Sequence, residues 1–118
     1  MAVIESKNMN TPDETRTPDK TKIEVVNVGG SEVGRFTFQP GWKWSECIKP
    51  VVKTESCQAE HFGYVEAGRI HIVHTDGAEV DLGRGDAYLI APGHDAWVLG
   101  NEPFVAIEFR SAATYAKS

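Results

Sequence analysis

The sequence has few cysteines, no long apolar run and fewer basic than acidic residues, and each shortage excludes a class of protein. Its two cysteines, Cys47 and Cys57, are too few for a disulfide scaffold, so we expect free thiols. No apolar stretch is long enough for a secretory signal or a membrane span, so we expect a cytoplasmic protein with no membrane partner. The net charge of −5 argues against binding DNA or RNA, because nucleic-acid affinity depends on clustered Lys and Arg.

The length and composition fit one folded domain preceded by a polar segment. A chain of 118 residues with 41% hydrophobic and 25% charged residues has the ordinary balance of a globular domain. Residues 1–22 differ, because they are rich in Thr, Pro, Asp, Glu and Lys and have almost no apolar side chain after Ile4. Such a segment buries too little apolar surface to offset an ordering entropy of about 1–2 kcal/mol per residue. We expect residues 1–22 to be a flexible arm, or alternatively a strand exchanged with a second subunit, and residues 23–118 to be the folded domain.

From Ile23 onward, short alternating apolar runs are separated by turn residues. We expect strands at residues 23–28, 32–38, 42–48, 58–66, 69–74, 78–82, 87–91, 96–99 and 104–110. The Asp76-Gly77 pair is the sharpest hairpin signal, because that turn class needs residues that tolerate positive φ. Many short strands, with no helix-length periodic segment between them, predict an all-β antiparallel sandwich or barrel.

Alternation also predicts which side chains face the inside of the barrel, since successive strand residues point to opposite sides. In residues 57–65 the smaller and more apolar set, which should line the interior, is Cys57, Ala59, His61, Gly63 and Val65. In residues 42–48 one face carries Trp42, Trp44, Glu46 and Ile48. Two indoles and one carboxylate facing inward would make a mostly apolar pocket wall with one polar group.

Two segments resemble the signature motifs of the cupin family. Gly85-Asp86-Ala-Tyr-Leu-Ile-Ala-Pro92-Gly93 is similar to the second signature, in which Gly-Asp opens a strand and Pro-Gly closes it ahead of an inward-facing histidine. Gly63-Tyr-Val-Glu-Ala-Gly68-Arg-Ile-His-Ile resembles the second half of the first signature. The resemblance covers about residues 35–110. It implies a cupin-type antiparallel β-barrel, also called a double-stranded β-helix or jelly roll, and for a chain of this size it implies a homodimer.

The resemblance does not extend to the metal ligands of metal-binding cupins. In those proteins the first signature supplies His-x-His and then a Glu seven residues before the turn glycine, and the second supplies a His three residues after Pro-Gly. Here those positions hold Thr54, Ser56, His61 and Ala96. Because Thr, Ser and Ala cannot replace imidazole, carboxylate or thiolate donors, we favour a site without a metal cofactor.

A rearranged metal site is the alternative. His94 lies two residues before Ala96 and shares its inward face if the strand extends that far, and Cys57 lies on the face of His61. Glu60 or Asp95 could turn in from a loop. A site built on His61 and His94 would hold iron, manganese, nickel or zinc. We otherwise expect Cys57 to be an inert apolar filler.

The other two histidines are predicted to lie outside any site. His71 and His74 are three residues apart on one expected strand, so they point to opposite faces and cannot chelate one ion together. We interpret both as surface or rim residues.

We expect a small-molecule-binding domain that works without metal and holds an organic ligand through Trp42, Trp44, Glu46, His61 and His94. One alternative is a metal-free lyase, isomerase or dehydratase in which His61 is the acid or base, because its ordinary pKa of about 6.5 is close to the working pH. Another is a metal-dependent oxygenase or isomerase at a His61/His94 site. A third is an assembly module whose barrel is filled with side chains, with His61 a buried neutral ring.

Overall fold

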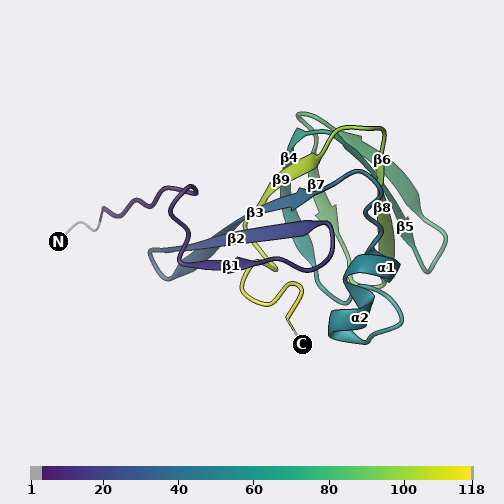
Figure 1. The fold of residues 1–118 in the computed structure, drawn as a ribbon, viewed down its shortest axis with the longest axis horizontal. Helices are drawn as coiled ribbons and strands as arrows, with labels where there is room; N and C mark the ends of the chain where they lie inside the picture. Colours follow the sequence, from purple (N-terminus) through teal and green to yellow (C-terminus); the bar gives the residue numbers. More distant parts are fainter. Residues whose placement is uncertain (1–3, 118) are drawn as a thin grey trace.

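Two antiparallel sheets form the framework of residues 4–117, the part of the chain that the computed structural model describes (Figure 1). The larger sheet has, in spatial order, β1 (Glu14–Arg16), β2 (Thr21–Val28), β3 (Ser31–Phe38), β9 (Phe104–Glu108), β4 (His61–Ala67) and β7 (Ala87–Ile90). The smaller sheet has β6 (Glu79–Gly83), β5 (Arg69–His74) and β8 (His94–Leu99). The predicted all-β, jelly-roll architecture is confirmed.

The predicted strand at residues 42–48 is wrong, because the chain there forms the short helices α1 (Trp44–Cys47) and α2 (Lys49–Val52). Trp44, Cys47 and Ile48 are buried at positions i, i+3 and i+4, which is the spacing of one helical face. Pro50 in the first turn of α2 favours a helix start, since its φ is fixed near the helical value and the missing N–H is not needed there. Within residues 4–117 no helix has the length and apolarity needed to cross a bilayer.

The sheet starts earlier in the chain than expected. Residues 14–16, inside the predicted arm, form β1 and pair with residues 23–25 of β2, which itself begins at Thr21. Arg16 at the end of β1 donates hydrogen bonds to the carbonyl oxygens of Ala112, Ala113 and Tyr115 at 2.9, 3.0 and 2.6 Å. The boundary at residue 22 is therefore not the edge of the sheet, while the flexibility of the rest of the segment stays a prediction.

The core lies between the two sheets, and β4 faces it as the sequence predicts. Along β4 buried and exposed residues alternate, with His61, Gly63 and Val65 inside. Gly63 pairs with Glu108 of β9, and a Cβ atom at Gly63 would collide with the backbone carbonyl of Ile107. The absence of a side chain at this position lets β4 and β9 approach closely, and this approach brings Glu108 beside His61.

Candidate functional site

Cys57, His61 and His94 converge inside the barrel. The sulfur atom and one ring nitrogen from each histidine all lie within 4.8 Å of one another, and all three residues are buried. His61 and His94 are the first residues of β4 and β8, and their ring centroids are 5.1 Å apart. Cys57 precedes β4 and is fixed to β8, because its backbone N–H donates to the His94 carbonyl at 2.7 Å. The strand ends that meet here thus determine the cluster.

The ring of His61 is oriented by a carboxylate. Its Nδ1 atom lies 2.6 Å from Oε1 of Glu108, and its Nε2 atom lies 3.6 Å from the sulfur of Cys57. Because a carboxylate accepts hydrogen bonds, Nδ1 is the donor to Glu108 and Nε2 is the nitrogen aimed at the cluster. Burial opposes the charged ring, but the charge of Glu108 and hydrogen bonds to Cys57 and Glu108 raise the pKa of His61 to about 10.

Glu108 is itself held by two hydroxyl groups. Tyr88 donates to Oε2 and Ser111 donates to Oε1, each at 2.7 Å. Burial, together with the charge of Glu108, raises the pKa of Tyr88, so its phenol stays protonated and remains a donor. With three donors, the buried carboxylate of Glu108 is well satisfied and fixes the orientation of the His61 ring.

His94 presents its ring in the same way. Its Nδ1 atom donates to the carbonyl oxygen of Ala91 at 2.8 Å. The remaining ring nitrogen, Nε2, is then free to face Cys57 and His61. Both imidazoles thus have one anchored nitrogen and one nitrogen available to the centre of the cluster.

Cys57 differs from the inert filler that its apolar neighbours indicated. Burial disfavours ionisation of its thiol, but hydrogen bonds from His61 and His94 and the positive charge of these rings lower its pKa to about 6. The other cysteine, Cys47, is buried without such partners, and burial raises its pKa. Cys57 therefore ionises more readily than an ordinary thiol, and the thiolate is the form that binds metals and attacks electrophiles.

The barrel interior beside the cluster is almost full. Its cavity has a volume of about 30 Å³ and is lined by Trp42, Trp44, His61 and His94 among others. Such a space holds one or two water molecules on the scale of about 10–15 Å³ for each. The indoles are 2% and 1% exposed, and Trp42 stacks on Phe38 at a centroid distance of 3.8 Å. Four of the five predicted residues, all except Glu46, line this one cavity, but the tryptophans pack as core rather than as an open wall.

Other residues considered in the sequence lie outside the cluster. Glu46 is exposed on α1, because the helix turns it away from the tryptophans. Glu60 pairs with a surface arginine, and Asp95 accepts hydrogen bonds from two backbone N–H groups. His71 pairs with carboxylates on the outer face of β5 and β6, and His74 contacts the carbonyl of Pro92 at 2.7 Å. The two histidines are rim residues, as expected.

The positions that correspond to the cupin ligands do not supply the cluster. The hydroxyl of Thr54 donates to the backbone carbonyl of Ser56, and Ala96 is a buried part of the cavity wall. Their neighbours Cys57 and His94 point inward instead. The candidate metal-ligand donors of this chain therefore lie one residue after Ser56, at Cys57, and two residues before Ala96, at His94.

Three residues of this network, Tyr88, Glu108 and Ser111, were missing from the predicted site, and a fourth, Cys57, was considered only in the rearranged alternative. A signal existed for two of them. Cys57 shares the inward face of His61 in the alternation of residues 57–65, and Glu108 shares a face with Phe104 and Ala106 on β9. A carboxylate on a buried strand face needs strong partners, so it marks a polar centre.

Comparison with known proteins gives information on the fold. No family model and no curated protein matches the chain. The crystal structure of Lactobacillus farciminis oxalate decarboxylase in complex with formate is similar at a TM-score of 0.59 and 15% identity, covering 86% of this chain and 32% of that one. The present chain thus spans about a third of that protein, as the 32% coverage states.

Two smaller proteins match over nearly their whole length. A Rhizobium leguminosarum protein of unknown function has a TM-score of 0.59 and 18% identity, with 92% of this chain and 98% of that chain covered. An uncharacterised Klebsiella pneumoniae protein with a double-stranded β-helix domain has a TM-score of 0.57 and 19% identity, with 85% and 84% covered. At these identities the similarities establish the fold alone.

Proposed function

We propose that this chain, which has a cupin-like fold, binds one divalent transition-metal ion through Cys57, His61 and His94. One observation carries the proposal: the sulfur and two ring nitrogens lie within 4.8 Å of one another in a buried cluster. The sequence favoured a metal-independent site, and the cluster supports its rearranged alternative, in which Cys57 shares the face of His61.

The donor set fits such an ion. Thiolate and imidazole are the ligands preferred by zinc and by several other first-row metals. The distance from Cys57 Sγ to His61 Nε2 is 3.6 Å. Two ligand bonds of about 2.3 Å and about 2.0 Å at a tetrahedral angle would separate sulfur and nitrogen by about 3.5 Å. Little movement would be needed to seat an ion there.

The surroundings of the two histidines also fit. Metal-bound imidazoles usually donate their second N–H to a carboxylate or a backbone carbonyl, which fixes the tautomer and ring direction. His61 has Glu108 for this role and His94 has the carbonyl of Ala91. Tyr88 and Ser111 in turn hold Glu108 in place. Three protein ligands would leave one coordination position open, and a metal bound there would supply Lewis-acid chemistry to a small molecule.

A second candidate, a metal-free acid-base and nucleophilic site, is favoured by the row Cys57, His61 and Glu108. The sulfur faces Nε2 at 3.6 Å and Nδ1 faces the carboxylate at 2.6 Å. This order of nucleophile, imidazole and orienting carboxylate is the arrangement of activated cysteine nucleophiles. It retains the proposed role of His61 as acid or base, with Cys57 as its partner.

Elemental analysis separates the two candidates. We would purify the chain without a polyhistidine tag or added metal and measure bound metals, then load metal-free protein with Co²⁺ and record the near-ultraviolet thiolate-to-cobalt band. We expect about one equivalent of metal per chain and a charge-transfer band, because one thiolate is among the three ligands.

The two buried cysteines provide a matched control. Cys57→Ser should abolish the charge-transfer band, whereas Cys47→Ser should keep it, since Cys47 does not belong to the cluster of Cys57, His61 and His94. A wild-type chain that takes up neither Co²⁺ nor Zn²⁺ would contradict the metal site and leave the metal-free candidate.

A further inference from the structure

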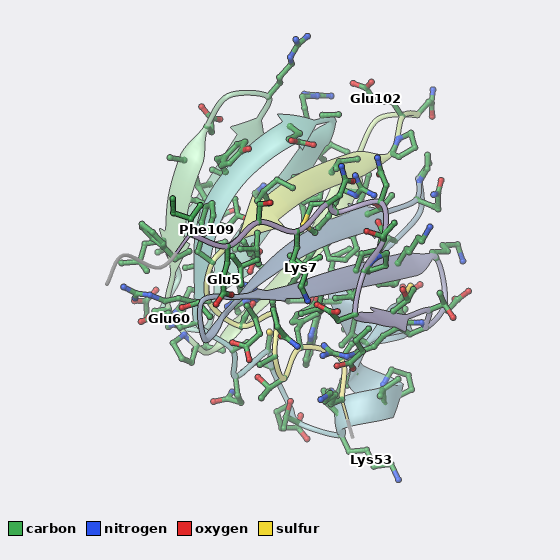
Figure 2. The ribbon with its side chains drawn as sticks, turned by 90° about the vertical axis from the view of Figure 1, so that its left-hand side faces the viewer. Glu5, Lys7, Lys53, Glu60, Glu102 and Phe109 are labelled. Atoms are coloured by element: carbon green, nitrogen blue, oxygen red, sulfur yellow. The ribbon has the colours of Figure 1, made fainter. Side chains whose placement is uncertain are left out.

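A second cavity lies on the outer side of Cys57. It has a volume of about 220 Å³ and is bounded by α1 and α2, by residues 54–59 and by residues 114–116. Figure 1 shows the C-terminal segment, in yellow, ending beside α2, and Figure 2, in which Lys53 marks the end of α2, shows the same proximity. We call this space the outer chamber. It is distinct from the small cavity inside the barrel.

The outer chamber is joined to the cluster by shared walls. Cys57 lines the outer chamber, and Trp44 and Tyr115 line both the chamber and the barrel cavity. The ring of Tyr115 stands edge-on to the ring of His61, with centroids 5.2 Å apart. A molecule in the chamber would therefore contact Cys57, the residue that also belongs to the cluster, without displacing the packed interior of the barrel.

The lining of the chamber defines the chemistry of its occupant. Apolar walls come from the helices, through Trp44, Ile48 and Val52, and the uncharged polar groups are those of Thr54, Gln58 and Thr114. Within residues 4–117, no Asp, Glu, Lys, Arg or His side chain lines the chamber. A charged ligand would lose its hydration there, and the thiol of Cys57 offers no free counter-charge because it is already paired with the rings of His61 and His94, so binding of a charged ligand is costly.

We propose that the outer chamber is a binding site for a small, uncharged, largely apolar molecule, about the size of one ring, that carries a hydrogen-bonding group. Its volume of about 220 Å³ is below the usual range for drug-sized ligands, about 300–1,000 Å³, which sets the size. The further step, that this molecule is the substrate of the cluster, rests on the proposed function. Contact with Cys57 leads to chemistry only if the cluster binds a metal ion or acts as a nucleophilic site.

Arg16 hydrogen-bonds to the segment that forms the C-terminal wall of the chamber. The guanidinium of Arg16 donates to the carbonyl oxygens of Ala112, Ala113 and Tyr115, and the side chain is only 10% exposed. Residues 114–116 form one wall of the chamber, so Arg16 is a positioning residue for the site. An Arg16→Gln substitution should weaken binding while leaving the ligand-contacting side chains unchanged.

The test uses four probes of similar size. Benzamide and benzyl alcohol are neutral, and benzoate and benzylammonium are their charged counterparts. We expect the neutral pair to shift the amide resonances of Thr54, Gln58 and Thr114 in a saturable way, with transferred contacts to the methyl groups of Ile48 and Val52. The affinity for the charged pair should be lower by about tenfold or more, because a charged probe has to be desolvated to enter the chamber.

A variant that fills the chamber gives the control. Ala59 is a partly buried residue that lines the chamber. In the Ala59→Phe variant the added ring should occupy the chamber, so the affinity for benzamide should fall about tenfold or more. Ala78→Phe, at an exposed residue that does not line the chamber, should leave affinity unchanged. If the Ala59→Phe variant does not fold, the contacts between the probe and the methyl groups of Ile48 and Val52 in the wild-type chain test the proposal instead. Absence of those contacts, or equal binding of charged and neutral probes, would overturn the proposal.

Failure of this proposal and failure of the metal site are distinguishable. Metal content is measured on the same samples as probe binding. Probe binding by a chain that takes up no metal would contradict the metal centre alone, and metal uptake without saturable probe binding would contradict the outer chamber alone.

Discussion

The Nδ1 atom of His61 lies 2.6 Å from the Oε1 atom of Glu108, although the two residues are 47 positions apart in the chain. The contact exists because β4 and β9 are neighbours and Gly63 allows them to approach closely. It fixes which nitrogen of His61 faces Cys57. Through this contact, the pairing of β4 with β9 determines how the ring of His61 is oriented in the cluster.

Glu108→Gln should weaken metal binding about 10- to 100-fold, the usual effect of removing the partner of a metal-bound imidazole. The amide keeps the shape of the side chain but removes its charge, so the His61 ring loses basicity as a ligand. Affinity for Zn²⁺ can be measured by competition with a chromophoric chelator. Glu102→Gln in an exposed turn is the matched control (Figure 2), and equal affinity of both variants would contradict the role of Glu108.

Cys57 should be alkylated with an unusual pH dependence in protein stripped of metal. The folded-state pKa is lowered to about 6 from an ordinary value of 9.0, so the thiolate predominates above about pH 6 and contributes stability that is lost as pH falls through that value. In a Cys47→Ser background, the rate of reaction with iodoacetamide should rise with a midpoint near that pKa. A midpoint near the ordinary value would show that His61 and His94 do not stabilise the thiolate.

Features of the fold that depend on local sequence could be predicted, whereas those that depend on contacts between distant segments could not. The strands and the inward face of His61 follow from local alternation, and the fold follows from the two motifs around Gly68 and Gly85. The helix at residues 44–47 was missed because Trp42, Trp44 and Glu46 also fit a two-residue period, and short apolar runs do not separate the two periods.

The site could be predicted only in part, because its members come from different strands. His61 and His94 were found from their places in the motifs. The contacts of His61 with Cys57 and Glu108 depend on the pairing of β4 with β9 and of residue 57 with residue 94. Register between distant strands is not encoded in local spacing, so alternation could place Cys57 and Glu108 on inward faces but could not predict their contacts with His61.

His71 should titrate above its ordinary pKa. Its Nδ1 atom donates to Asp81 and its Nε2 atom to Glu79, and the hydrogen bond to Asp81, partly opposed by desolvation, is the largest reason that the pKa is raised above 6.5. The resulting stabilisation is fully present below pH 6.5 and is lost as pH rises through the folded-state pKa. Histidine titration by NMR checks this. Asp81→Asn should bring the pKa of His71 back toward 6.5, and an unchanged value would rule out the assigned cause.

The homodimer expected from the sequence has a candidate interface on the outer face of β4, β7 and β9. Phe62, Tyr64, Leu89 and Phe109 are 45%, 38%, 63% and 49% exposed. Phe62 pairs with Leu89 across β4 and β7, and Tyr64 and Phe109 have ring centroids 6.5 Å apart, so the four form one patch. Figure 2 shows Phe109 on this face. A contiguous apolar patch of this kind is typical of an interaction surface.

A second copy of the chain is the occupant that we predict for this patch. Strand β7 ends the larger sheet and has no strand partner on its outer side within residues 4–117, so a second β7 could pair with it. Glu60 and Arg110 beside the patch are already paired with each other, so they do not oppose the approach of a second copy through unpaired charge.

Leu89→Glu should therefore convert a dimer into a monomer of 13.0 kDa, because it places a charge at the most exposed point of the patch. Light scattering coupled to gel filtration measures the mass directly. Val51→Glu on α2, away from the patch, is the control and should stay dimeric. A wild-type chain that elutes as a 13.0 kDa species at micromolar concentration would contradict the dimer, and a dimer unaffected by Leu89→Glu would place the interface elsewhere, since a buried unpaired carboxylate at this point would cost several kcal/mol.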